Sequence, residues 1–430
     1  MEINRILIAN RGEIALRVIR TCREMGIHTI AVYSDADKES SHVRMADQAF
    51  HIGPALSHKS YLNMDNVLGA AVESGAQAVH PGYGFLSENA EFARACEEKG
   101  IIFIGPSAAS IERAGDKALA RQTLIDSGIP VIPGSPKVLS SPEQACQAAE
   151  QVGFPVILKA SGGGGGRGMR IAHSRDELLQ AFGTASGEAK AAFNNPDIYL
   201  EKYIQKPRHI EIQILGDRFG NYVHLNEREC SIQMRYQKLI EEAPSPFVDE
   251  DLRRVLGDTA IKIARAMDYV NAGTMEFLVD KDKNFYFMEV NARIQVEHPV
   301  TEMITGVDMV EQQIRMARGE KLGLAQEDLA PKGWAMECRV NAEDPFRGFL
   351  PSTGIITQSL LPAGPGIRVD SGVYSGFEIS PYYDALIAKL IVHEETREET
   401  IARMKRALEE YRVIGVRTNI PFHQALMENP

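Results

Sequence analysis

The chain has 430 residues and a formal net charge of −11, and 44% of its residues are hydrophobic and 24% are charged. This is the composition of a globular protein, and the length predicts two or three domains. The acidic balance argues against nucleic acid or an anionic membrane as the main partner.

Nothing in the sequence predicts a membrane span or an export signal. No apolar run approaches the roughly 18 residues that a membrane-spanning helix needs. The start of the chain, MEINRILIANRGEIALR, lacks the basic-then-apolar layout of a signal peptide. The cysteines have no metal or redox spacing, which favours reduced thiols and a cytoplasmic location; they are Cys22, Cys96, Cys146, Cys230 and Cys338.

The first hundred residues alternate short apolar strands with helices. The pattern predicts a helix over 12–26 ending at Gly26, and strands over 5–10, 29–34, 76–81 and 101–106. This rhythm predicts a parallel sheet whose functional edge lies at the carboxyl ends of its strands. A dinucleotide site at the first turn is disfavoured, because NRGE holds one glycine instead of GxGxxG.

A Pro/Gly/Ser-rich segment at 129–144 separates this unit from a small subdomain. A helix is predicted from Ser141 or Pro142 to Gly153, followed by strands at 155–160 and 170–173. The two strands flank SGGGGGRGM, whose backbone N–H groups could bind phosphate oxygens. We expect this loop to be a lid over a triphosphate, with Lys159 gripping the anion. A P-loop is excluded because no GK[ST] closes the run, whereas a flexible linker remains an alternative.

Later segments are mainly strands with a few helices. Glu201, Lys202 and Ile204 follow the strand IYL; they could frame an adenine, although a solvated charged turn is the simpler interpretation. Strands at 209–217 and 222–229 come next. The pattern then predicts helices at 250–268 and 306–318, a β-rich unit beginning at 334–344, and a closing helix at 396–411.

The stretch from Met275 to Glu302 is the most informative part of the chain. It reads as strands at 275–279 and 285–290 joined by the turn DKDKN. In that register Glu276 and Glu289 face each other, about 5 Å apart at Cβ, and repel. A hard divalent cation such as magnesium would turn this repulsion into attraction. The pair could instead occupy the wet face of an edge hairpin, and the register could slip by one residue.

A dense polar run follows the hairpin and strengthens the prediction of a site. Its first four members alternate along the chain; the run consists of Asn291, Arg293, Gln295, Glu297 and His298. Taken alone, Glu297 and Arg293 could form a structural ion pair, and Arg339 could be an ordinary surface or salt-bridge arginine. Only the whole constellation predicts catalysis.

Together these motifs resemble the ATP-grasp enzymes and, within them, the biotin carboxylases. The likeness covers essentially all 430 residues, and ten segments carry it in order: IANRGEIALR at 8–17, HPGYGFLSEN at 80–89, GDKALA at 115–120, KASGGGGGRGM at 159–169, EKYI at 201–204, PRHIEIQ at 207–213, QKLIEEAP at 237–244, NARIQVEHPVTE at 291–302, ECRVNAEDP at 337–345 and PYYDALIAKL at 381–390. The resemblance implies a mixed α/β and α+β chain with the ATP-grasp fold. It implies a Rossmann-like N-terminal domain over 1–115, an ATP-grasp domain over 116–330 with a mobile lid at about 135–203, and a β-rich C-terminal domain over 331–430.

In this family ATP phosphorylates bicarbonate to carboxyphosphate, which delivers CO2 to the ureido nitrogen of biotin on a carrier protein. The implied contacts to ATP come from lysines, the glycine lid and the adenine pocket: Lys117, Lys159, Gly164, Gly165, Gly166, Glu201, Lys202, Ile204, His209 and Gln233. The implied ligands of magnesium or manganese are Glu276, Glu289 and Asn291.

The resemblance also implies roles around bicarbonate and biotin. Bicarbonate would be held by Lys238, Arg293, Gln295 and the backbone of Val296. Glu297 would be its base, with a raised pKa expected beside a bound oxyanion, and Arg339 would stabilise the biotin anion. The biotin side would be bordered by Tyr83, Glu88 and Asp384.

The sequence departs from the family in two places. Met234 and Tyr236 stand where many members carry an arginine and a histidine, so a nucleotide role at position 236 is in doubt. The chain ends at Pro430, short of where relatives usually stop, so we expect a piece that closes the adenine pocket to be missing.

The expected partners are a biotin carboxyl carrier protein and a carboxyltransferase subunit, with the chain itself a homodimer. Acetyl-CoA carboxylase in fatty acid biosynthesis is the expected context, and a two-subunit pyruvate or propionyl-CoA carboxylase is the alternative. Another ATP-grasp ligase, or a nucleotide-binding subunit without turnover, are the competing functions.

Overall fold

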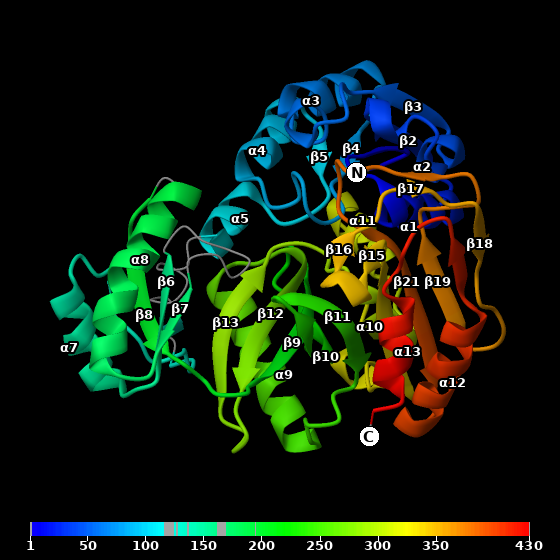
Figure 1. Cartoon of the computed structure of the whole chain (residues 1–430). Helices are drawn as coiled ribbons and strands as arrows, with labels where there is room; N and C mark the ends of the chain where they lie inside the picture. The colour runs from blue at the N-terminus through cyan, green and yellow to red at the C-terminus, as the bar shows by residue number, and fades with distance from the viewer. Residues whose placement is uncertain are drawn as a thin grey trace.

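The computed structural model describes residues 2–115, 124–125, 128–135, 137–160, 169–193 and 195–429. Figure 1 shows an N-terminal region above, a small lobe standing apart at the left, and a large sheet with flanking helices in the centre and at the right. Within the described ranges, no helix has the length and apolar character needed to cross a membrane.

The N-terminal region is the parallel sheet that the alternating pattern predicts. The strand order is β3-β2-β1-β4-β5, and every pair is parallel. The pattern missed β3, whose half-exposed residues QAFH form one edge. The strands are β1 (Arg5–Ile8), β2 (His28–Tyr33), β3 (Gln48–His51), β4 (Ala78–His80) and β5 (Ile102–Phe103), and the helices are α1 (Gly12–Glu24), α2 (Ser41–Met45), α3 (Met64–Glu73), α4 (Ala90–Glu98) and α5 (Ala108–Gly115).

The small lobe has a hydrophobic core of its own. Its antiparallel sheet has the order β7-β6-β8 and packs with α7 and α8. As predicted, α7 begins after Ser141, whose hydroxyl accepts from the N–H of Gln144, and ends at Gly153, where φ is +79°. Its elements are α7 (Pro142–Val152), β6 (Val156–Ala160), β7 (Arg170–Ala172), α8 (Arg175–Phe193) and β8 (Ile198–Lys202). Lys117 and the predicted glycine lid, with Gly164, Gly165 and Gly166, lie outside the described residues.

An eight-stranded antiparallel sheet forms the centre of the molecule. Its order is β13-β12-β9-β10-β11-β14-β21-β19, so strands from both sides of the predicted boundary at residue 330 join one ladder. The strands are β9 (Arg208–Gly216), β10 (Tyr222–Met234), β11 (Gln237–Ala243), β12 (Asn271–Val279), β13 (Phe285–Asn291), β14 (Trp334–Asn341), β19 (Ile367–Ser371) and β21 (Leu386–Glu394).

The predicted helices around this sheet are present, and two more, at 298–305 and 420–427, were not predicted, so the helix at 397–410 is not the last one. Helix α10 begins after Glu297, within the polar run, and ends at Gly306 in the left-handed region. The predicted helix at 306–318 therefore begins only at Met309. The helices are α9 (Glu250–Ala266), α10 (His298–Thr305), α11 (Met309–Arg318), α12 (Arg397–Glu410) and α13 (Ile420–Met427), and the short strands are β15 (Glu343–Asp344), β16 (Leu350–Pro351), β17 (Gly354–Ile355), β18 (Gln358–Leu360), β20 (Glu378–Ile379) and β22 (Arg412–Ile414).

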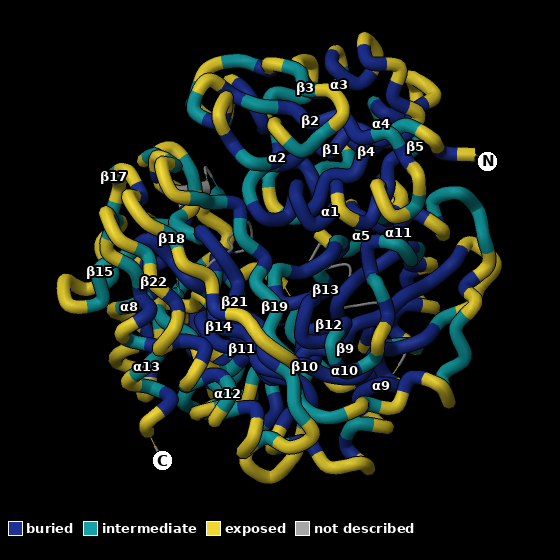
Figure 2. The backbone as a smooth tube through the Cα atoms, turned by 90° about the vertical axis from the view of Figure 1, so that its right-hand side faces the viewer, coloured by how far each residue is buried: buried dark blue, intermediate teal, exposed yellow. Residues whose placement is uncertain are grey.

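One face of the large sheet carries ionisable side chains on every strand, although most of its residues are buried (Figure 2). Directly opposed pairs follow one another across the ladders: Glu289 with Glu276, Glu276 with Glu211, Glu211 with Arg228, Glu241 with Glu337, Arg339 with Lys389, and Lys389 with Asp370. The pairing of the strands therefore places charged residues that are far apart in the sequence next to one another.

Candidate functional site

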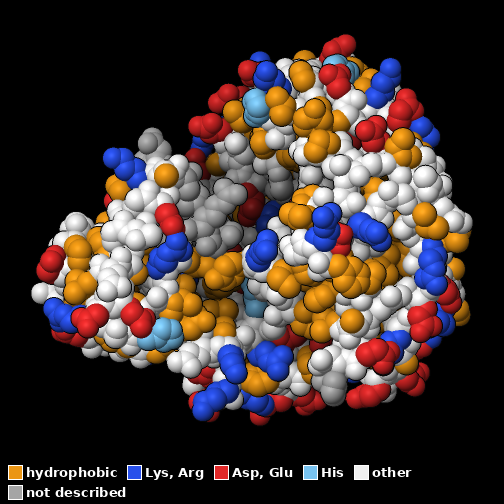
Figure 3. Space-filling model, in the orientation of Figure 1, with side chains coloured by type: hydrophobic (Ala, Val, Ile, Leu, Met, Phe, Trp, Pro, Cys, Tyr) orange, Lys and Arg blue, Asp and Glu red, His pale blue; other side chains and the backbone are white. Residues whose placement is uncertain are grey.

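A cavity of about 1170 Å³ opens between the N-terminal region, the small lobe and the large sheet. Figure 3 shows the molecule hollowed between the small lobe and the rest. All predicted site residues that the structure describes line this cavity except Glu88, which accepts a hydrogen bond from the lining residue Arg293. The predicted residues in the lining are Tyr83, Lys159, Glu201, Lys202, Ile204, His209, Gln233, Lys238, Glu276, Glu289, Asn291, Arg293, Gln295, Val296, Glu297, Arg339 and Asp384.

The predicted hairpin is present, and Glu276 faces Glu289 across it. Counted from the turn, the register places Phe277 opposite Phe287, so Met288 is an extra residue that bulges from β13. Without this bulge Glu276 would oppose Met288, and Glu289 would point to the other face of the sheet; this is the one-residue slip that the sequence left open. The pair opposes its charges only because of one inserted residue.

Lys238 contacts three carboxylates inside the cavity. Its Nζ lies 2.6 Å from Glu211, 3.1 Å from Glu276 and 2.6 Å from Glu297. Burial disfavours the ammonium ion, but Cys230 and these carboxylates outweigh burial and raise the pKa of Lys238 well above its usual value. The lysine is therefore a fixed positive charge between the hairpin and Glu297.

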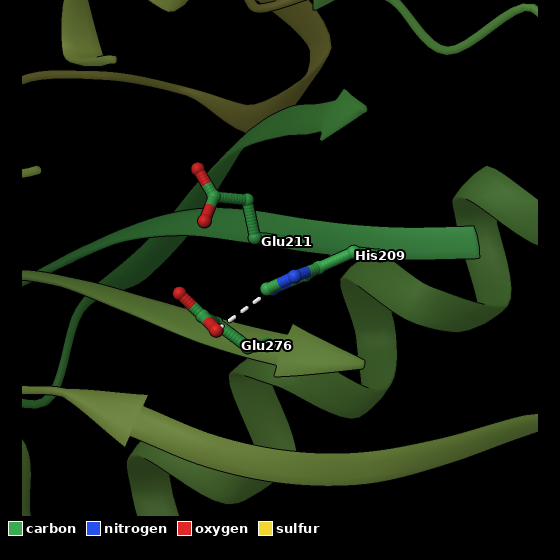
Figure 4. A group of neighbouring side chains, drawn as sticks. All are labelled: His209, Glu211 and Glu276. Atoms are coloured by element: carbon green, nitrogen blue, oxygen red, sulfur yellow. Dashed lines mark hydrogen bonds and ion pairs between the residues drawn. The ribbon is translucent and has the colours of Figure 1, made fainter. Parts of the chain in front are cut away.

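Glu276 is surrounded by donors. Its carboxylate lies 2.8 Å from Nε2 of His209 and accepts from Nδ2 of Asn291 at 2.8 Å. Burial raises the pKa of Glu276, but the opposing effect of Lys238 and His209 is larger, so its pKa is lowered. Figure 4 shows His209 and Glu211 on β9 and Glu276 on the neighbouring β12, with His209 directed at Glu276. Gln233 contacts the other ring nitrogen of His209 at 2.9 Å.

The donor set at the hairpin fits a hard divalent cation. Glu276 and Glu289 supply opposed carboxylates, and Asn291 supplies an amide beside them. Oxygen ligands of this kind suit magnesium or manganese. Glu211 and His209 also lie close, because ligand atoms of His209, Glu211 and Glu276 fall within 4.8 Å of one another.

The pKa of Glu297 is lowered in this structure, and the raised pKa expected beside a bound oxyanion stays a prediction. Its side chain is fully buried and lies 2.6 Å from Lys238 and 2.9 Å from Arg339. Burial raises the pKa of Glu297, but Lys238, Arg339 and Arg228 together lower it well below its ordinary value. The expectation assumed a bound oxyanion, whereas here the carboxylate itself neutralises the cations.

Arg293 is held by groups from two regions. Its guanidinium donates to Glu88 of the N-terminal region at 2.9 Å and to Oε1 of Gln295 at 2.9 Å. Burial disfavours its charge, but Glu88 raises the pKa of Arg293 above its usual value. Glu88, expected to border biotin, thus orients an arginine of the polar run.

Glu201 and Lys202 do not form a solvated charged turn. Both lie in β8, and Glu201 is buried. Lys202 donates to the carbonyl oxygens of Gly153 and Phe154 at 2.9 and 2.8 Å. Lys159, expected to grip an anion, lies 2.5 Å from Glu201 across the same sheet. A glutamate on a buried strand needs such a partner, which the charge-rich sequence alone did not reveal.

A second pair of opposed glutamates lies beneath Arg339. Glu241 and Glu337 face each other across β11 and β14, and Glu241 accepts from Arg339 at 2.6 Å. Burial raises the pKa of Glu241 to about 7 although Arg339 lowers it. Burial also raises the pKa of Glu337 well above its usual value, and neither oxygen of Glu337 has a hydrogen-bond partner among the described residues.

Lys389 fixes the backbone on the biotin side. Its buried Nζ donates to the carbonyl of Val296 at 2.8 Å and lies 3.2 Å from Glu13. Glu13 in turn accepts from the hydroxyl of Tyr83. The peptide of Val296 and the ring of Tyr83, both predicted site groups, are therefore held by one network.

Six supporting residues were missed by the sequence analysis. All are buried charged side chains on strands or helices; they are Glu13, Glu211, Arg228, Glu241, Glu337 and Lys389. The available signal was a charged residue on the buried side of a strand such as LIAKLIV, because such a charge must find a partner. The identity of that partner depends on strand order.

Three family models match the chain in sequence order. "Biotin carboxylase, N-terminal domain" matches residues 2–111, "Carbamoyl-phosphate synthase L chain, ATP binding domain" matches residues 116–325, and "Biotin carboxylase C-terminal domain" matches residues 337–430. Together they cover almost the whole chain.

Curated relatives match over full length. Biotin carboxylase 1 of Bacillus subtilis is 53% identical over 428 residues, which are 99% of this chain and 95% of that protein. The 2-oxoglutarate carboxylase small subunit of Hydrogenobacter thermophilus is 51% identical over 425 residues, which are 99% of this chain and 90% of that protein. Similarity of this degree extends to carboxylases with different acceptors.

Solved structures share the fold. A biotin carboxylase–β-γ-ATP complex from Campylobacter jejuni superposes with a TM-score of 0.97 at 49% identity, covering 100% of this chain and 96% of that one. The biotin carboxylase domain dimer of H. thermophilus 2-oxoglutarate carboxylase, with MgADP, ADP and bicarbonate, gives 0.95 at 51% identity, covering 100% and 94%. The chain therefore belongs to the biotin carboxylases, the ATP-grasp ligases of the biotin-dependent carboxylases.

Proposed function

We propose that the chain carboxylates biotin on a carrier protein, using ATP and bicarbonate through carboxyphosphate and releasing ADP and phosphate. The observation that carries this proposal is the row of contacts from Glu276 through Lys238 and Glu297 to Arg339 along one wall of the cavity. It links a carboxylate pair suited to metal–nucleotide binding with an arginine suited to a developing anion.

ATP lies between the small lobe and the hairpin in this proposal. Lys159, Glu201, Lys202 and Ile204 would contact the nucleotide from the lobe, and His209 and Gln233 from the large sheet. Glu276 and Glu289, with Asn291, would hold magnesium or manganese, which when bound neutralises charge on the phosphoryl group in transfer.

Bicarbonate would bind between Lys238, Arg293, Gln295 and the backbone of Val296. An anion placed there competes with Glu297 for the charge of Lys238, which raises the pKa of Glu297 towards the range of a working base. Glu297 then takes the proton of bicarbonate, and a bicarbonate oxygen attacks the terminal phosphorus of ATP. The low pKa of Glu297 without the anion makes its basicity depend on substrate.

Biotin would occupy the end of the cavity lined by Tyr83, Arg339 and Asp384. Carboxyphosphate releases CO2 and phosphate, and the phosphate takes the proton from the biotin ureido nitrogen. Arg339 stabilises the enolate-like biotin anion that results, which then attacks CO2. Its anchoring to Glu241 and Glu297 reduces reorganisation during this step.

We assign the chain to an acetyl-CoA carboxylase, in which a separate carboxyltransferase uses the carboxylated carrier for fatty acid biosynthesis. Biotin carboxylase 1 of B. subtilis, at 53% identity, supports the biotin carboxylase step, and a propionyl-CoA carboxylase is the alternative, because an alpha chain of that enzyme from Ruegeria pomeroyi is 51% identical. A homodimer is the proposed assembly, by analogy with the dimer of the H. thermophilus domain.

The test is ADP release with magnesium, ATP and bicarbonate, with and without free biotin. We expect biotin to stimulate turnover, and Arg339→Ala to remove that stimulation while ATP still binds. Arg339→Lys, which keeps the positive charge but loses the planar guanidinium and its paired N–H donors, serves as the matched control. ATP binding without turnover, even when biotinylated carrier is added, would contradict the proposal and favour a nucleotide-binding subunit.

A further inference from the structure

Two loops beside the cavity expose large aromatic side chains. Phe346, between β15 and β16, is 83% exposed, the highest fraction among the exposed large hydrophobic residues described. Tyr236, in the turn between β10 and β11, is 63% exposed. A single exposed ring is common on protein surfaces, whereas exposed apolar side chains that lie together mark interaction sites, so the position of these two loops relative to each other matters.

The loop of Phe346 is firmly held and does not expose its ring through lack of structure. The carboxylate of Asp344 accepts from the N–H of Phe346 at 3.0 Å, and the carbonyl of Asp344 accepts from the N–H of Phe349 at 2.9 Å. Gly348 and Phe349 both adopt left-handed φ angles, of +68° and +61°. The ring of Phe349 packs edge-on against Phe422, with centroids 5.2 Å apart. The fold thus fixes Phe346 in solvent.

The neighbouring turn is also fixed in an uncommon conformation. Arg235 and Tyr236 have φ angles of +51° and +67°, a region that costs non-glycine residues energy. A Cβ built on Gly348 would lie 4.0 Å from the guanidinium of Arg235, so the two loops adjoin. The turn at 235–236 and the loop at 345–349 therefore form one continuous surface.

This surface borders the biotin end of the cavity. Tyr236 and the 49%-exposed Tyr382 line the cavity, as do Glu343 and Asp384, whereas Phe346 lies outside its lining. Phe346 follows Arg339 by seven residues and so lies at most about 25 Å from it. Figure 1 places β15 and β16 near the centre of the view, and Figure 3, in the same orientation, shows hydrophobic and basic side chains beside the hollow.

The exposed charges of this surface outside the cavity lining are basic, which indicates an acidic partner; Glu343 and Asp384 lie in the lining, and the half-buried Asp344 is bonded to the N–H of Phe346. Arg235 and Arg347 are exposed, and neither forms an ion pair within the described residues, although the chain as a whole carries a net charge of −11. Aromatic side chains flanked by arginines are the residues that dominate protein interfaces. A free small molecule would enter the cavity without touching Phe346, whereas a protein that carries biotin must stop at this rim.

We infer that Arg235, Tyr236, Phe346, Arg347 and Tyr382, here named the rim surface, form the docking site of the biotin-bearing carrier domain. This inference rests on the proposed function. The carrier inserts its biotin towards Arg339, and an acidic, apolar patch around the biotinylated lysine contacts Phe346 and the two arginines. Docking at the rim raises the local concentration of biotin at the cavity.

The experiment compares free biotin with carrier-bound biotin as substrates of the full chain. The probe is a biotinylated carrier domain that supports turnover by the wild type, chosen from acetyl-CoA, pyruvate and propionyl-CoA carboxylase carriers. We expect Phe346→Ala to raise KM for this carrier about tenfold and to leave kcat/KM for free biotin unchanged. Phe346→Trp should retain carrier affinity, and Arg347→Glu should weaken it.

Phe219→Ala is the matched control. Phe219 is 52% exposed in the turn at the opposite end of β10 and does not line the cavity. Equal loss with both substrates, or no loss with the carrier, overturns the inference. Carboxylation of free biotin by a wild type that accepts no carrier also overturns it and leaves the proposed function intact. A change in sedimentation of Phe346→Ala would assign the surface to a second copy instead, and failure of the wild type on free biotin as well would remove the proposed function itself.

Discussion

Two pairs of opposed glutamates in one sheet behave differently. Glu276 and Glu289 lie on β12 and β13 at one edge of the sheet, and Glu241 and Glu337 lie on β11 and β14 beneath Arg339. Both pairs come from neighbouring antiparallel strands, where like charges repel. The pKa of Glu276 is nevertheless lowered, whereas those of Glu241 and Glu337 are raised.

The difference follows from the number of cations and from access to the cavity. Glu276 has Lys238 and His209 within 3.1 Å and lines the cavity. Glu241 shares its one close cation, Arg339, with Glu297, and Glu337 has no hydrogen-bond partner among the described residues. The same pairing thus favours a charged carboxylate in one place and a protonated one in the other.

Removing Lys238 should have the largest effect, since this lysine contacts both the hairpin and Glu297. Lys238→Gln leaves three buried carboxylates with one cation fewer. We expect a loss of about 3–5 kcal/mol in the free energy of unfolding, because a broken buried pair leaves uncompensated charge. Bicarbonate-dependent ADP release should fall about 100- to 1000-fold. Urea denaturation and steady-state kinetics measure the two effects, and unchanged stability would contradict the first.

Glu276→Gln should mainly affect the use of metal–ATP. We expect kcat to fall about 100-fold and half-saturation by magnesium to need a higher concentration, because one carboxylate of the hairpin is lost. Titration of magnesium at saturating ATP measures this. Glu73→Gln, on the exposed surface of α3, is the control. An unchanged magnesium requirement would show that the hairpin pair does not bind the metal.

The buried pair should appear as a pH dependence of stability. The pKa of Glu241 is raised from 4.5 to about 7, so its contribution is complete below pH 4.5 and is lost as the pH rises through 7. The stability of the wild type relative to Glu241→Gln should therefore decrease between pH 5 and 8, by at most about 1.4 kcal/mol per pH unit. Denaturation curves across that range test this; parallel curves for both proteins would contradict it.

Glu337→Gln should have the smallest effect. Its raised pKa keeps Glu337 neutral, and glutamine replaces a neutral acid by a neutral group of the same shape. We expect the free energy of unfolding at neutral pH to change by less than about 1 kcal/mol. Turnover with free biotin should stay near that of the wild type. A loss comparable to that of Glu276→Gln would show that Glu337 is charged and that the comparison between the pairs fails.

Much of the fold and the hairpin could be predicted because their signals are local. Strand and helix periodicity predicted the N-terminal sheet, α7 and the hairpin, and the spacing of Glu276 and Glu289 predicted their opposition. The resemblance of motifs predicted the family. Each of these needs only a short window of sequence or a set of ordered motifs.

The remaining features depend on register between distant strands. Glu241 opposes Glu337 from 96 residues away, and Glu211 reaches Lys238 from an adjoining ladder. The bulge at Met288 and the low pKa of Glu297 also depend on these contacts. A period-two pattern shows that such a residue faces inward, but it does not show which strand is next to it.

Strands from both sides of residue 330 pair in one sheet, and this pairing determines which parts of the molecule can unfold locally. Because β11 pairs with β14, neither neighbour can lose its hydrogen bonds without exposing the other. Amide protons along this seam should exchange with solvent only through global unfolding, whereas those of the separately packed small lobe should exchange through a local opening of lower free energy. We therefore expect the cavity residues of the large sheet to form one cooperative unit, and the small lobe to open without unfolding them.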